Sequence, residues 1–454
     1  MSERAELAPG LYGNEQPEAL QREAFRDGEY PVAVYGLGKM GLPIAAVFGE
    51  TTGAVTGVDI DETVVDTINE GGCHVKNEPG LADLVGDLVA DGALRATTDA
   101  VQAARDARIH VVIVPTLITE DDEPDTSVVT SVVRNIARGL SPGDLVCIES
   151  TLPPRTCRDV LGPLLRYESG LDFDDFGLAF CPERTSSGRA LADVRGSHPK
   201  VVGGINDEST RAAALVYGEL VDNEVITVSD TTTAEAVKVF EGLYRDVNIA
   251  LANELARFTE ELDIDVREAI EVANTQPYCD IHTPGPGVGG HCIPYYPYFV
   301  LNWLETPAPL LATAREVNDA TPDHVAGIVA GKLDDRGLDL SGATVVVLGL
   351  TYRAGVAETR ASPAIDICRS LASRGATVYA SDPLVDAEGV PATWVHPDEV
   401  SSIDADAVVL ATAHEEFDAI DWRAFPEETT VIDTRDVLDA SRIGRPVYVV
   451  GRGD

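Results

Sequence analysis

Short apolar runs alternate with longer segments of helical periodicity over much of the chain. Between residues 30 and 215 the apolar runs are "YPVAVYG", "AVTGVD", "RIHVVIVPT", "GDLVCIEST", "LAFCPER" and "PKVVGG". Continuous apolar runs of this length are typical of strands buried on both faces, as in a parallel sheet covered by helices. We therefore predict one doubly wound α/β domain over residues 30–215.

The pattern changes to uninterrupted helical periodicity after this domain. Residues 231–274 contain no proline and a single glycine, Gly242. A segment of this length and apolar content predicts a long connecting helix that packs against a partner. We assign residues 216–335 to a central helical domain.

A second series of apolar runs follows the helical segment. Its runs are "GATVVVLG", "GATVYASDP", "DADAVVLATA", "TTVIDTR" and "RPVYVVG". They predict a second α/β domain of the same kind over residues 336–454. Residues 1–29 lack such a run, and we interpret them as a polar N-terminal extension.

A glycine-rich turn joins the first predicted strand to the first helix. Gly36, Gly38 and Gly41 form G-x-G-x-x-G in "GLGKMG". Glycines at this spacing allow a tight turn and a close backbone approach, so that a pyrophosphate can bind at the helix N-terminus. Asp59 follows the second strand, where an acid binds ribose hydroxyls, and residues 60–62 offer no arginine for a 2′-phosphate. The motif predicts NAD binding in a Rossmann-like domain, with a turn that serves packing alone as the alternative.

The chain is strongly acidic. It carries 76 Asp and Glu against 34 Lys and Arg, a formal net charge of −42, and only five lysines. The carboxylates are spread along the chain, which favours a halophilic surface, because at about 1 M salt the Debye length is only about 3 Å. An acidic partner-binding surface is the alternative. Nucleic-acid binding is disfavoured, since it needs a basic face.

The chain contains no apolar run of membrane-spanning length, so we expect no membrane partner. Its first thirty residues lack an apolar signal segment, and we expect a cytoplasmic protein. Seven cysteines occur without C-x-x-C spacing, which argues against a disulfide framework and against a metal site.

One cysteine stands apart from the others. Cys292 directly follows the glycine-rich stretch "PGPGVGGH", where backbone can approach a ligand closely. The thiol is either a nucleophile or a buried filler, and a nucleophilic thiolate needs a positive charge nearby. Lys238 is a candidate for this charge, because the chain otherwise uses arginine as its surface cation; an ordinary surface lysine is the alternative.

Several motifs occur together in a characteristic order. They are "GLGKMGLP", "ESTLPPRT", "CPER", "YRDVNIALANE", "GPGVGGHCIP" and "GLTYR…ETRASPA". From about residue 30 to 450 this set resembles the UDP-glucose/GDP-mannose dehydrogenase family. The third, fourth and fifth motifs look most like the branch that oxidises UDP-N-acetylmannosamine or UDP-N-acetylglucosamine.

The resemblance implies a four-electron oxidation of a sugar C6 alcohol with two NAD. Cys292 would capture the aldehyde as a thiohemiacetal, which is oxidised to a thioester and hydrolysed to the 6-carboxylate. Lys238 would stabilise the oxyanion or act as an acid or base. Glu183 and Thr151 would transfer protons and position water.

The resemblance also implies binding residues and an assembly. The implied cofactor-binding residues are Gly36, Gly38, Gly41, Asp59, Pro115, Thr116 and Arg360. The implied residues for a UDP-sugar substrate are Gly289, Gly290 and Arg353. The central helix would form the core of a homodimer.

Three positions depart from the family pattern. Gly242 stands where the family carries asparagine, Tyr296 where it carries aspartate, and Tyr278 where the amino-sugar branch carries arginine. One interpretation is an active enzyme with a different sugar or a slower hydrolysis step. The alternative is a non-catalytic or two-electron paralogue that binds NAD or a nucleotide sugar.

Overall fold

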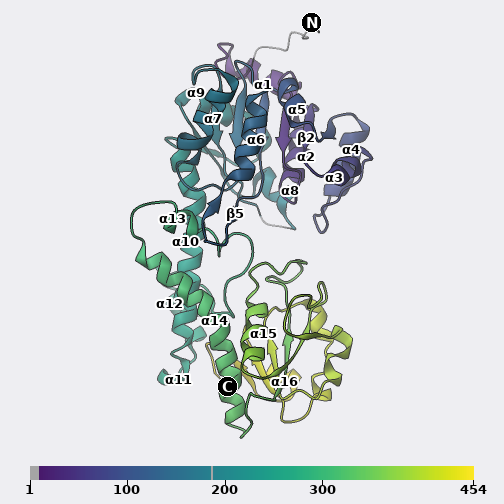
Figure 1. Cartoon of the computed structure of the whole chain (residues 1–454), viewed down its shortest axis with the longest axis vertical. Coiled ribbons are helices and arrows are strands. Elements are labelled where there is room, and N and C mark those ends of the chain that lie inside the picture. The colour runs from purple at the N-terminus through teal and green to yellow at the C-terminus, as the bar shows by residue number, and fades with distance from the viewer. Residues whose placement is uncertain (1–9, 186–187, 454) are drawn as a thin grey trace. The chain divides into compact units, whose positions relative to one another are not determined.

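The computed structural model describes residues 10–185 and 188–453, which fall into two compact units (Figure 1). The first unit runs to Phe240 and includes Tyr298–Trp303, and the second holds Glu241–Pro297 and the chain from Leu304 onward. Helix α10 (Thr231–Ala256) is continuous through the boundary. The central domain predicted over residues 216–335 is therefore shared between two units in the structure.

The first unit is built on a mixed sheet of eight strands. In spatial order these are β10 (Val225–Thr227), β9 (Lys200–Gly204), β8 (Gly177–Phe180), β7 (Leu145–Ile148), β4 (Ile109–Val112), β1 (Val32–Tyr35), β2 (Val55–Val58) and β3 (Leu94–Thr97). Six neighbouring pairs are parallel, but β8 and β9 are antiparallel. All six apolar runs predicted as strands occur in this sheet, although the last of them runs against the expected direction.

The sheet extends beyond the predicted limit at residue 215. After β9 the chain forms α9 and then returns to the edge of the sheet as β10, which pairs in parallel with β9. The short run of β10 is half exposed, with Ile226 at 41 % exposure, so it lacks the apolar signal of a buried strand. A separate hairpin joins β5 (Leu117–Ile118) to β6 (Pro124–Asp125).

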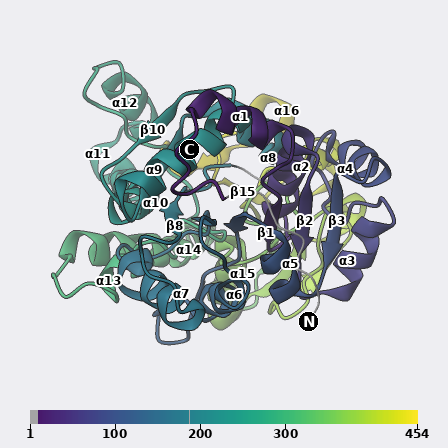
Figure 2. The same cartoon turned by 90° about the horizontal axis from the view of Figure 1, so that it is seen from above.

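Helices cover both faces of this sheet (Figure 2). One face carries α1 (Glu18–Arg26), α2 (Gly41–Thr52), α3 (Glu62–Asn69), α4 (Leu81–Ala90) and α9 (Asp207–Leu220). The other carries α5 (Ala100–Asp106), α6 (Ser127–Ala137) and α7 (Gly162–Ser169). Along β1, Val32 and Val34 enter the first core and Ala33 and Tyr35 the second, as the two-residue period of a strand requires. The doubly wound fold class is thereby confirmed.

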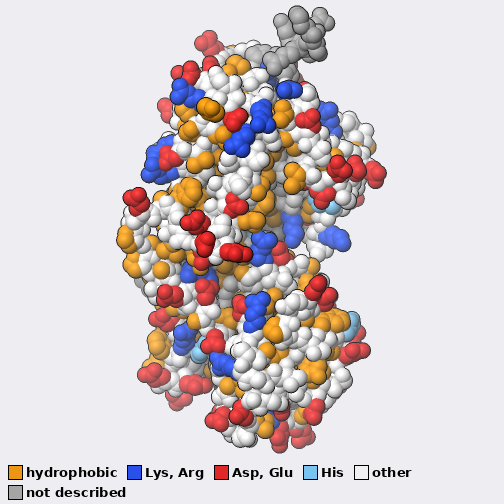
Figure 3. Space-filling view, viewed as in Figure 1, with side chains coloured by type: hydrophobic (Ala, Val, Ile, Leu, Met, Phe, Trp, Pro, Cys, Tyr) orange, Lys and Arg blue, Asp and Glu red, His pale blue; other side chains and the backbone are white. Residues whose placement is uncertain are grey.

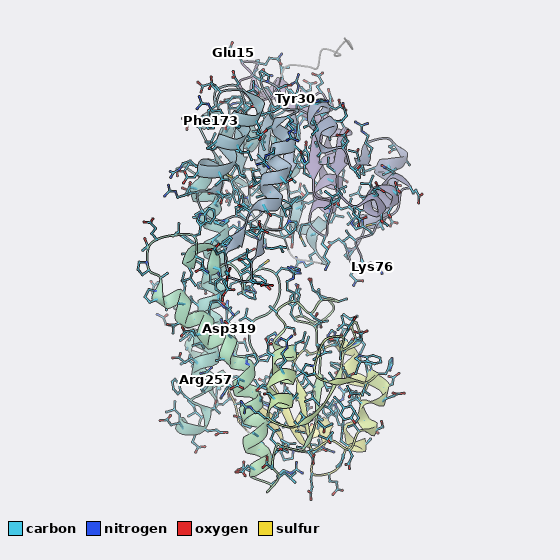
Figure 4. The ribbon with its side chains drawn as sticks, in the orientation of Figure 1. Glu15, Tyr30, Lys76, Phe173, Arg257 and Asp319 are labelled. Atoms are coloured by element: carbon cyan, nitrogen blue, oxygen red, sulfur yellow. The ribbon has the colours of Figure 1, made fainter. Side chains whose placement is uncertain are left out.

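The segment predicted as a polar extension belongs to the core where the structure describes it. Leu11 and Phe25 are fully buried, and the Phe25 ring meets Phe48 of α2 edge to face at 6.5 Å. Tyr12 donates a hydrogen bond to the carbonyl of Phe173, a residue labelled in Figure 4. The interpretation as an extension is wrong for residues 10–29, because scattered apolar residues without periodicity gave no sign of burial.

The second unit carries a six-stranded, all-parallel sheet. In spatial order its strands are β13 (Thr393–Trp394), β12 (Thr377–Ser381), β11 (Thr344–Leu348), β14 (Ala407–Leu410), β15 (Thr430–Asp433) and β16 (Val447–Val449). The five apolar runs of the second series correspond to five of these strands. The sequence gives no signal for β13, which has only two residues.

One face of this sheet is covered by α14 (Pro309–Asp334) and α15 (Pro363–Ser373). The other is covered by 3₁₀ turns at Pro397–Ser402, Glu415–Ala419 and Trp422–Ala424, which contribute Val400, Phe417 and Trp422 to the core. The remaining helices of the unit are α11 (Thr259–Leu262), α12 (Val266–Ala273) and α16 (Ala440–Ile443).

Within the second unit, α10 is joined to α14 by buried polar groups. Asp246 is fully buried on α10 and accepts hydrogen bonds from Arg315 and Asn318 of α14. Arg315 also binds Asp319, which is labelled in Figure 4. Since a buried carboxylate is tolerated only when it is paired and hydrogen-bonded, this pair holds the two helices in one register.

No helix in the described parts of the chain is long and apolar enough to cross a membrane. On the face seen in Figure 3, the acidic side chains are scattered over both units and do not gather in one patch. The halophilic interpretation of this charge stays a prediction.

We expect the thermal unfolding midpoint to rise by several degrees between about 0.1 M and about 2 M KCl, because salt screens the repulsion among surface carboxylates. Differential scanning calorimetry measures this midpoint. Sucrose at matched osmolality is the control, since it leaves charge repulsion unscreened. A midpoint that is constant or falls with KCl contradicts the halophilic interpretation.

Candidate active site

The glycine turn after β1 leaves space for a ligand at one glycine and packs tightly at the other two. Gly36 has φ 93°, and a Cβ there would lie 2.3 Å from the carbonyl oxygen of Ile113. A Cβ at Gly41 would lie 1.7 Å from the Gly36 oxygen, whereas a Cβ at Gly38 would meet nothing within 4 Å. The turn is thus closed on the protein side and open at Gly38, three residues before α2 begins, where the N–H groups at the helix N-terminus favour an anion.

Asp59 follows β2 and is held at the mouth of this turn. Its carboxylate accepts hydrogen bonds from the backbone N–H of Leu37 at 2.8 Å and of Asp61 at 3.0 Å. These two bonds orient the carboxylate and leave further lone pairs for hydroxyl donors. This geometry fits the predicted ribose contact.

Pro115 and Thr116 follow β4 at the carboxyl edge of the sheet, and Pro115 is exposed. The Thr116 Oγ1 atom is buried and makes no hydrogen bond to any residue that the structure describes. A buried hydroxyl without a protein partner is costly and indicates a ligand or water partner. With the open turn at Gly38 and the acid at Asp59, the residues present fit NAD.

Glu183 and Lys238 lie close enough to influence each other within the first unit. Burial raises the pKa of the Glu183 carboxyl above its ordinary value, and the positive charge of Lys238 acts in the opposite direction. The Glu183 carboxylate also accepts a hydrogen bond from the backbone N–H of Thr185. A buried carboxyl beside an ammonium group is a typical general acid or base.

A second charged cluster lies behind Glu183. The Nζ atom of Lys200 binds the buried carboxylate of Glu149 at 2.7 Å, and the Tyr217 hydroxyl donates to the same carboxylate at 2.6 Å. These residues and Glu183 line a small cavity of about 40 Å³. The cluster supports the strand end that carries Thr151, which is half-buried two residues after Glu149.

Glu235 is a positioning residue that the sequence analysis missed. This fully buried residue precedes Lys238 by one turn of α10. Its carboxylate accepts hydrogen bonds from the N–H groups of Arg155 at 2.5 Å and Cys157 at 2.7 Å. It therefore ties the loop after Thr151 to the helix that carries Lys238. The partners lie about 80 positions apart in the chain, so no local signal could have predicted this contact.

In the second unit, the loop that carries Cys292 rests on the loop between β11 and α15. The Cys292 side chain is exposed. Gly290 has φ 99° and donates its N–H to the carbonyl of Arg360 at 2.9 Å. The Tyr352 side chain lies against both glycines: a Cβ at Gly290 would come within 2.9 Å of its ring, and a Cβ at Gly289 within 2.8 Å of its Cβ atom. The interpretation of Cys292 as a buried filler is wrong, because the thiol faces solvent.

Polar side chains surround this junction. His291, next to Cys292, contacts the carboxylate of Glu358. Burial raises the pKa of the Tyr352 phenol, and the negative charge of Glu358 adds to this effect. Arg353 and Arg360 are exposed on the same loop. The structure thus brings Cys292 into the neighbourhood of both predicted arginines.

Two buried arginines at the carboxyl edge of the second sheet were not predicted. Arg267 donates to the carbonyls of Val450 and Pro284. Burial, aided by the charge of Arg267, lowers the pKa of Arg435 to about 10. A Cβ at Gly285 would lie 3.3 Å from the Arg435 guanidinium, so positive charge lies directly beneath the glycine-rich loop. Arg435 is the last residue of the predicted run "TTVIDTR", a position that could have drawn attention to it.

The predicted catalytic residues divide between the two units. Thr151, Glu183 and Lys238 belong to the first unit with the predicted NAD-binding turn, and Cys292 belongs to the second. The activation of Cys292 by Lys238 stays a prediction. Of the three departures from the family pattern, Tyr278 is 94 % exposed, while Gly242 and Tyr296 lie in mutual contact.

Comparison with known protein families gives three matches in chain order. They are the NAD binding domain (residues 30–221), the central domain (232–320) and the UDP binding domain (346–440) of the UDP-glucose/GDP-mannose dehydrogenase family.

Individual relatives match over almost their whole length. A UDP-N-acetyl-D-mannosamine dehydrogenase of Pyrococcus horikoshii is 35 % identical, with 93 % of this chain and 99 % of the relative covered. An NDP-N-acetyl-D-galactosaminuronic acid dehydrogenase of Ralstonia solanacearum is 36 % identical, with 91 % and 97 % covered. The solved structure of the P. horikoshii UDP-D-ManNAc dehydrogenase superposes with a TM-score of 0.84 at 34 % identity, covering 93 % of this chain and all of that one. The solved structure of the Staphylococcus aureus UDP-N-acetyl-mannosamine dehydrogenase superposes with a TM-score of 0.80 at 32 % identity, covering 93 % of this chain and 98 % of that one.

These matches, together with the open glycine turn and the acid Asp59 beside it, make the chain an NAD-dependent oxidoreductase. It belongs to the UDP-glucose/GDP-mannose dehydrogenase family, as the ordered motifs predict.

The buried carboxyl of Glu235 generates a prediction on stability. Burial raises the pKa of Glu235 to about 7. A carboxyl whose pKa rises on folding stabilises the folded state at low pH, and this contribution is lost as the pH rises through the folded value. The measured quantity is the unfolding free energy of the wild type minus that of the variant Glu235→Gln. We expect this difference to fall by on the order of 3 kcal/mol between about pH 4 and about pH 8.

Urea unfolding at a series of pH values measures this difference. Glu254→Gln, at an exposed position of the same helix, is the matched control and should give a difference that is flat with pH. A flat difference for Glu235→Gln as well excludes a raised pKa at this position.

Proposed function

We propose that the chain oxidises the C6 hydroxymethyl group of a UDP-N-acetylhexosamine, UDP-N-acetylmannosamine or UDP-N-acetylglucosamine, to the uronic acid. The observation that carries this proposal is the exposed thiol of Cys292 on a loop that rests against the segment bearing Arg353 and Arg360. A thiol beside a phosphate-binding segment suits covalent capture of a nucleotide sugar. The names of the relatives from P. horikoshii and R. solanacearum support an amino-sugar substrate.

The second unit offers the groups that a UDP-sugar requires. Guanidinium groups bind phosphate oxygens in pairs, and Arg353 and Arg360 are exposed for this contact. Gly289 and Gly290 present backbone without side chains, so that a sugar can approach closely. The buried charge of Arg435 makes the potential beneath this loop more positive.

In the first unit, Gly36, Gly38, Gly41, Asp59, Pro115 and Thr116 would hold NAD. Bound there, NAD accepts hydride in each of two oxidations. The overall reaction converts one alcohol and one water into a carboxylate, with two NAD reduced and three protons released. The electrons from the alcohol carbon are thereby balanced.

The residues of the chain divide the remaining work. Glu183, buried near an ammonium group, would take the proton of the C6 hydroxyl and later activate the hydrolytic water. The thiolate of Cys292 would add to the aldehyde carbon to form a thiohemiacetal, and a thioester after the second oxidation. Lys238 would stabilise the oxyanion in both addition steps, and Thr151 would orient the water.

We expect two NADH per sugar from the wild-type protein and no uronic acid from Cys292→Ala. The variant lacks the sulfur that holds the aldehyde carbon through the second oxidation. Absorbance of NADH and mass spectrometry of the sugar product, at high salt with a panel of UDP- and GDP-sugars, measure both outcomes. Cys279→Ala, which removes a half-buried thiol of the same unit, is the matched control and should keep full activity.

Three results would contradict the proposal. Uronic acid at the wild-type rate from Cys292→Ala removes this thiol from the mechanism. One NADH per sugar makes the aldehyde the product and the chain a two-electron enzyme. Tight NAD binding without NADH from any sugar identifies a non-catalytic paralogue.

We further propose that the protein acts as a homodimer formed through α10. Tyr244 and Leu251, two turns apart on this helix, are 50 % and 46 % exposed. With Leu243, Val247 and Leu311 they line an apolar surface hollow within the second unit. Large apolar side chains gathered on one helix face mark an interface, and a second copy of the helix presents a complementary row.

Leu251→Asp should convert a dimer into a monomer, because the carboxylate would be buried unpaired in the interface. Sedimentation velocity over a range of protein concentrations measures the state of assembly. Leu310→Asp, at an exposed position of α14, is the control for added negative charge. A wild-type protein that sediments as a monomer at every concentration excludes the dimer.

A further inference from the structure

Two of the positions that depart from the family pattern occupy one space. A Cβ at Gly242 would lie 2.0 Å from Cδ2 of the Tyr296 ring and 2.9 Å from its Cε2. The ring is buried, with 7 % of the residue exposed. Any side chain at position 242 therefore competes with the tyrosine ring for the same volume. Both residues belong to the second unit.

Tyr296 is coupled to Cys292 through the backbone. The N–H groups of Tyr295 and Tyr296 both donate to the carbonyl of Cys292, each at 3.0 Å. Residues 292–296 thus form one tight helical turn, with the thiol at its start and the Tyr296 ring at its end. The contact of the Tyr296 ring with Gly242 of α10 fixes the position of this turn, because a hydrogen-bonded turn has little internal freedom.

We propose that Tyr296 is a positioning residue whose ring, seated in the notch that Gly242 leaves in α10, fixes the orientation of the Cys292 thiol. The inference rests on the proposed function in one respect, that Cys292 is the nucleophile. Compared with the family pattern, Gly242 replaces an asparagine and Tyr296 replaces an aspartate. The two replacements match in shape, because the tyrosine ring fits the space beside the glycine. Packing contacts of the ring hold this turn, since a buried ring makes many contacts of small individual energy.

Both partners of such a fit are needed together. A methyl group added at Gly242 forces the ring out of its site, and removal of the ring leaves a cavity. Either change alone releases the turn that holds the thiol. When both changes are made, the added methyl group fills part of the cavity and the clash disappears.

The test is a double-mutant cycle on the full chain with Gly242→Ala, Tyr296→Ala and both together, measured first by thermal unfolding. Each single variant should lower the unfolding midpoint by several degrees. The midpoint of the double variant should be higher than the value obtained by adding the two single shifts. Gly331→Ala is the matched control, because it lies in α14 and a Cβ there meets nothing within 4 Å. Its midpoint should stay level or rise, since alanine favours a helix over glycine.

A second readout reports on the thiol itself. The rate of Cys292 alkylation by iodoacetamide, followed by peptide mass spectrometry across pH, should rise several-fold in Tyr296→Ala and stay at the wild-type value in Tyr296→Phe. In the oxidation assay, kcat of Tyr296→Ala should fall ~10- to 100-fold, as expected for a displaced nucleophile, with an unchanged KM for NAD. Tyr296→Phe retains the ring and should restore both values.

Additive midpoint shifts, or a Tyr296→Phe variant that behaves like Tyr296→Ala, overturn the proposal. So does a Tyr296→Ala variant with altered stability but unaltered alkylation and kcat, because the ring would then be merely structural. The midpoint cycle and the alkylation rates need no sugar. They separate a failure of this inference from a failure of the proposed function, which Cys292→Ala decides.

Discussion

A loop made of glycine and proline cannot hold itself in place, and the reactive loop of this protein has that composition. Its backbone is held by other elements within the second unit: Asn248 accepts the N–H of His282, Asn253 accepts that of Gly285, and Arg360 accepts that of Gly290. Both asparagines lie on α10, whose register against α14 is set by the buried pair of Asp246 and Arg315. Since hydrogen bonds act only over fixed distances, the position of the loop depends on that helix and on the segment that bears Arg360. The motif "YRDVNIALANE" therefore describes a scaffold for the loop as much as a helix.

The two sheets share the glycine turn after their first strand but differ in the length of the segment that follows it. Gly36 and Gly349 both have positive φ after the first strand of their sheets, and a Cβ at either would lie 2.3 Å from the carbonyl oxygen of a neighbouring strand end. Asp59 and Asp382 both follow the second strand and accept backbone N–H groups of the glycine turn. In the first sheet α2 starts five residues after its glycine, which leaves a tight dinucleotide turn. In the second sheet a longer segment, residues 350–362, precedes α15 and bears the exposed arginines. The same start thus serves a cofactor in one unit and a substrate segment in the other.

The apolar runs predicted the inner strands of both sheets and β16 at one edge, because burial on both faces leaves an unbroken apolar run in the sequence. The other edge strands, β3, β10 and β13, are partly exposed and carry no such run. The reversed direction of β9 left no trace in the sequence, since a strand buried on both faces has the same composition in either direction. The motifs that hold Gly36, Asp59, Glu183 and Cys292 can be recognised in the sequence because each depends on local spacing, and the roles of these residues stay predictions. Glu235 and Arg435 were missed because their roles arise from backbone groups that only the fold brings near. Sequence patterns therefore indicate candidate reacting groups, but they give no sign of buried groups that hold distant segments together.

The departures at Gly242 and Tyr296 have different meanings when they are considered singly and together. Singly, each removes a polar side chain that the family carries, and two such losses suggest a site released from its chemistry. Together they form one exchange that conserves packing, because the tyrosine ring occupies the space that the glycine vacates. A site released from selection has no reason to keep such a fit, nor the asparagine contacts that hold the same loop. The chain also retains Glu183, Thr151 and Lys238, to which the proposed function assigns the acid–base work. The exchange therefore argues for an altered pocket around a working thiol, and against an abandoned one.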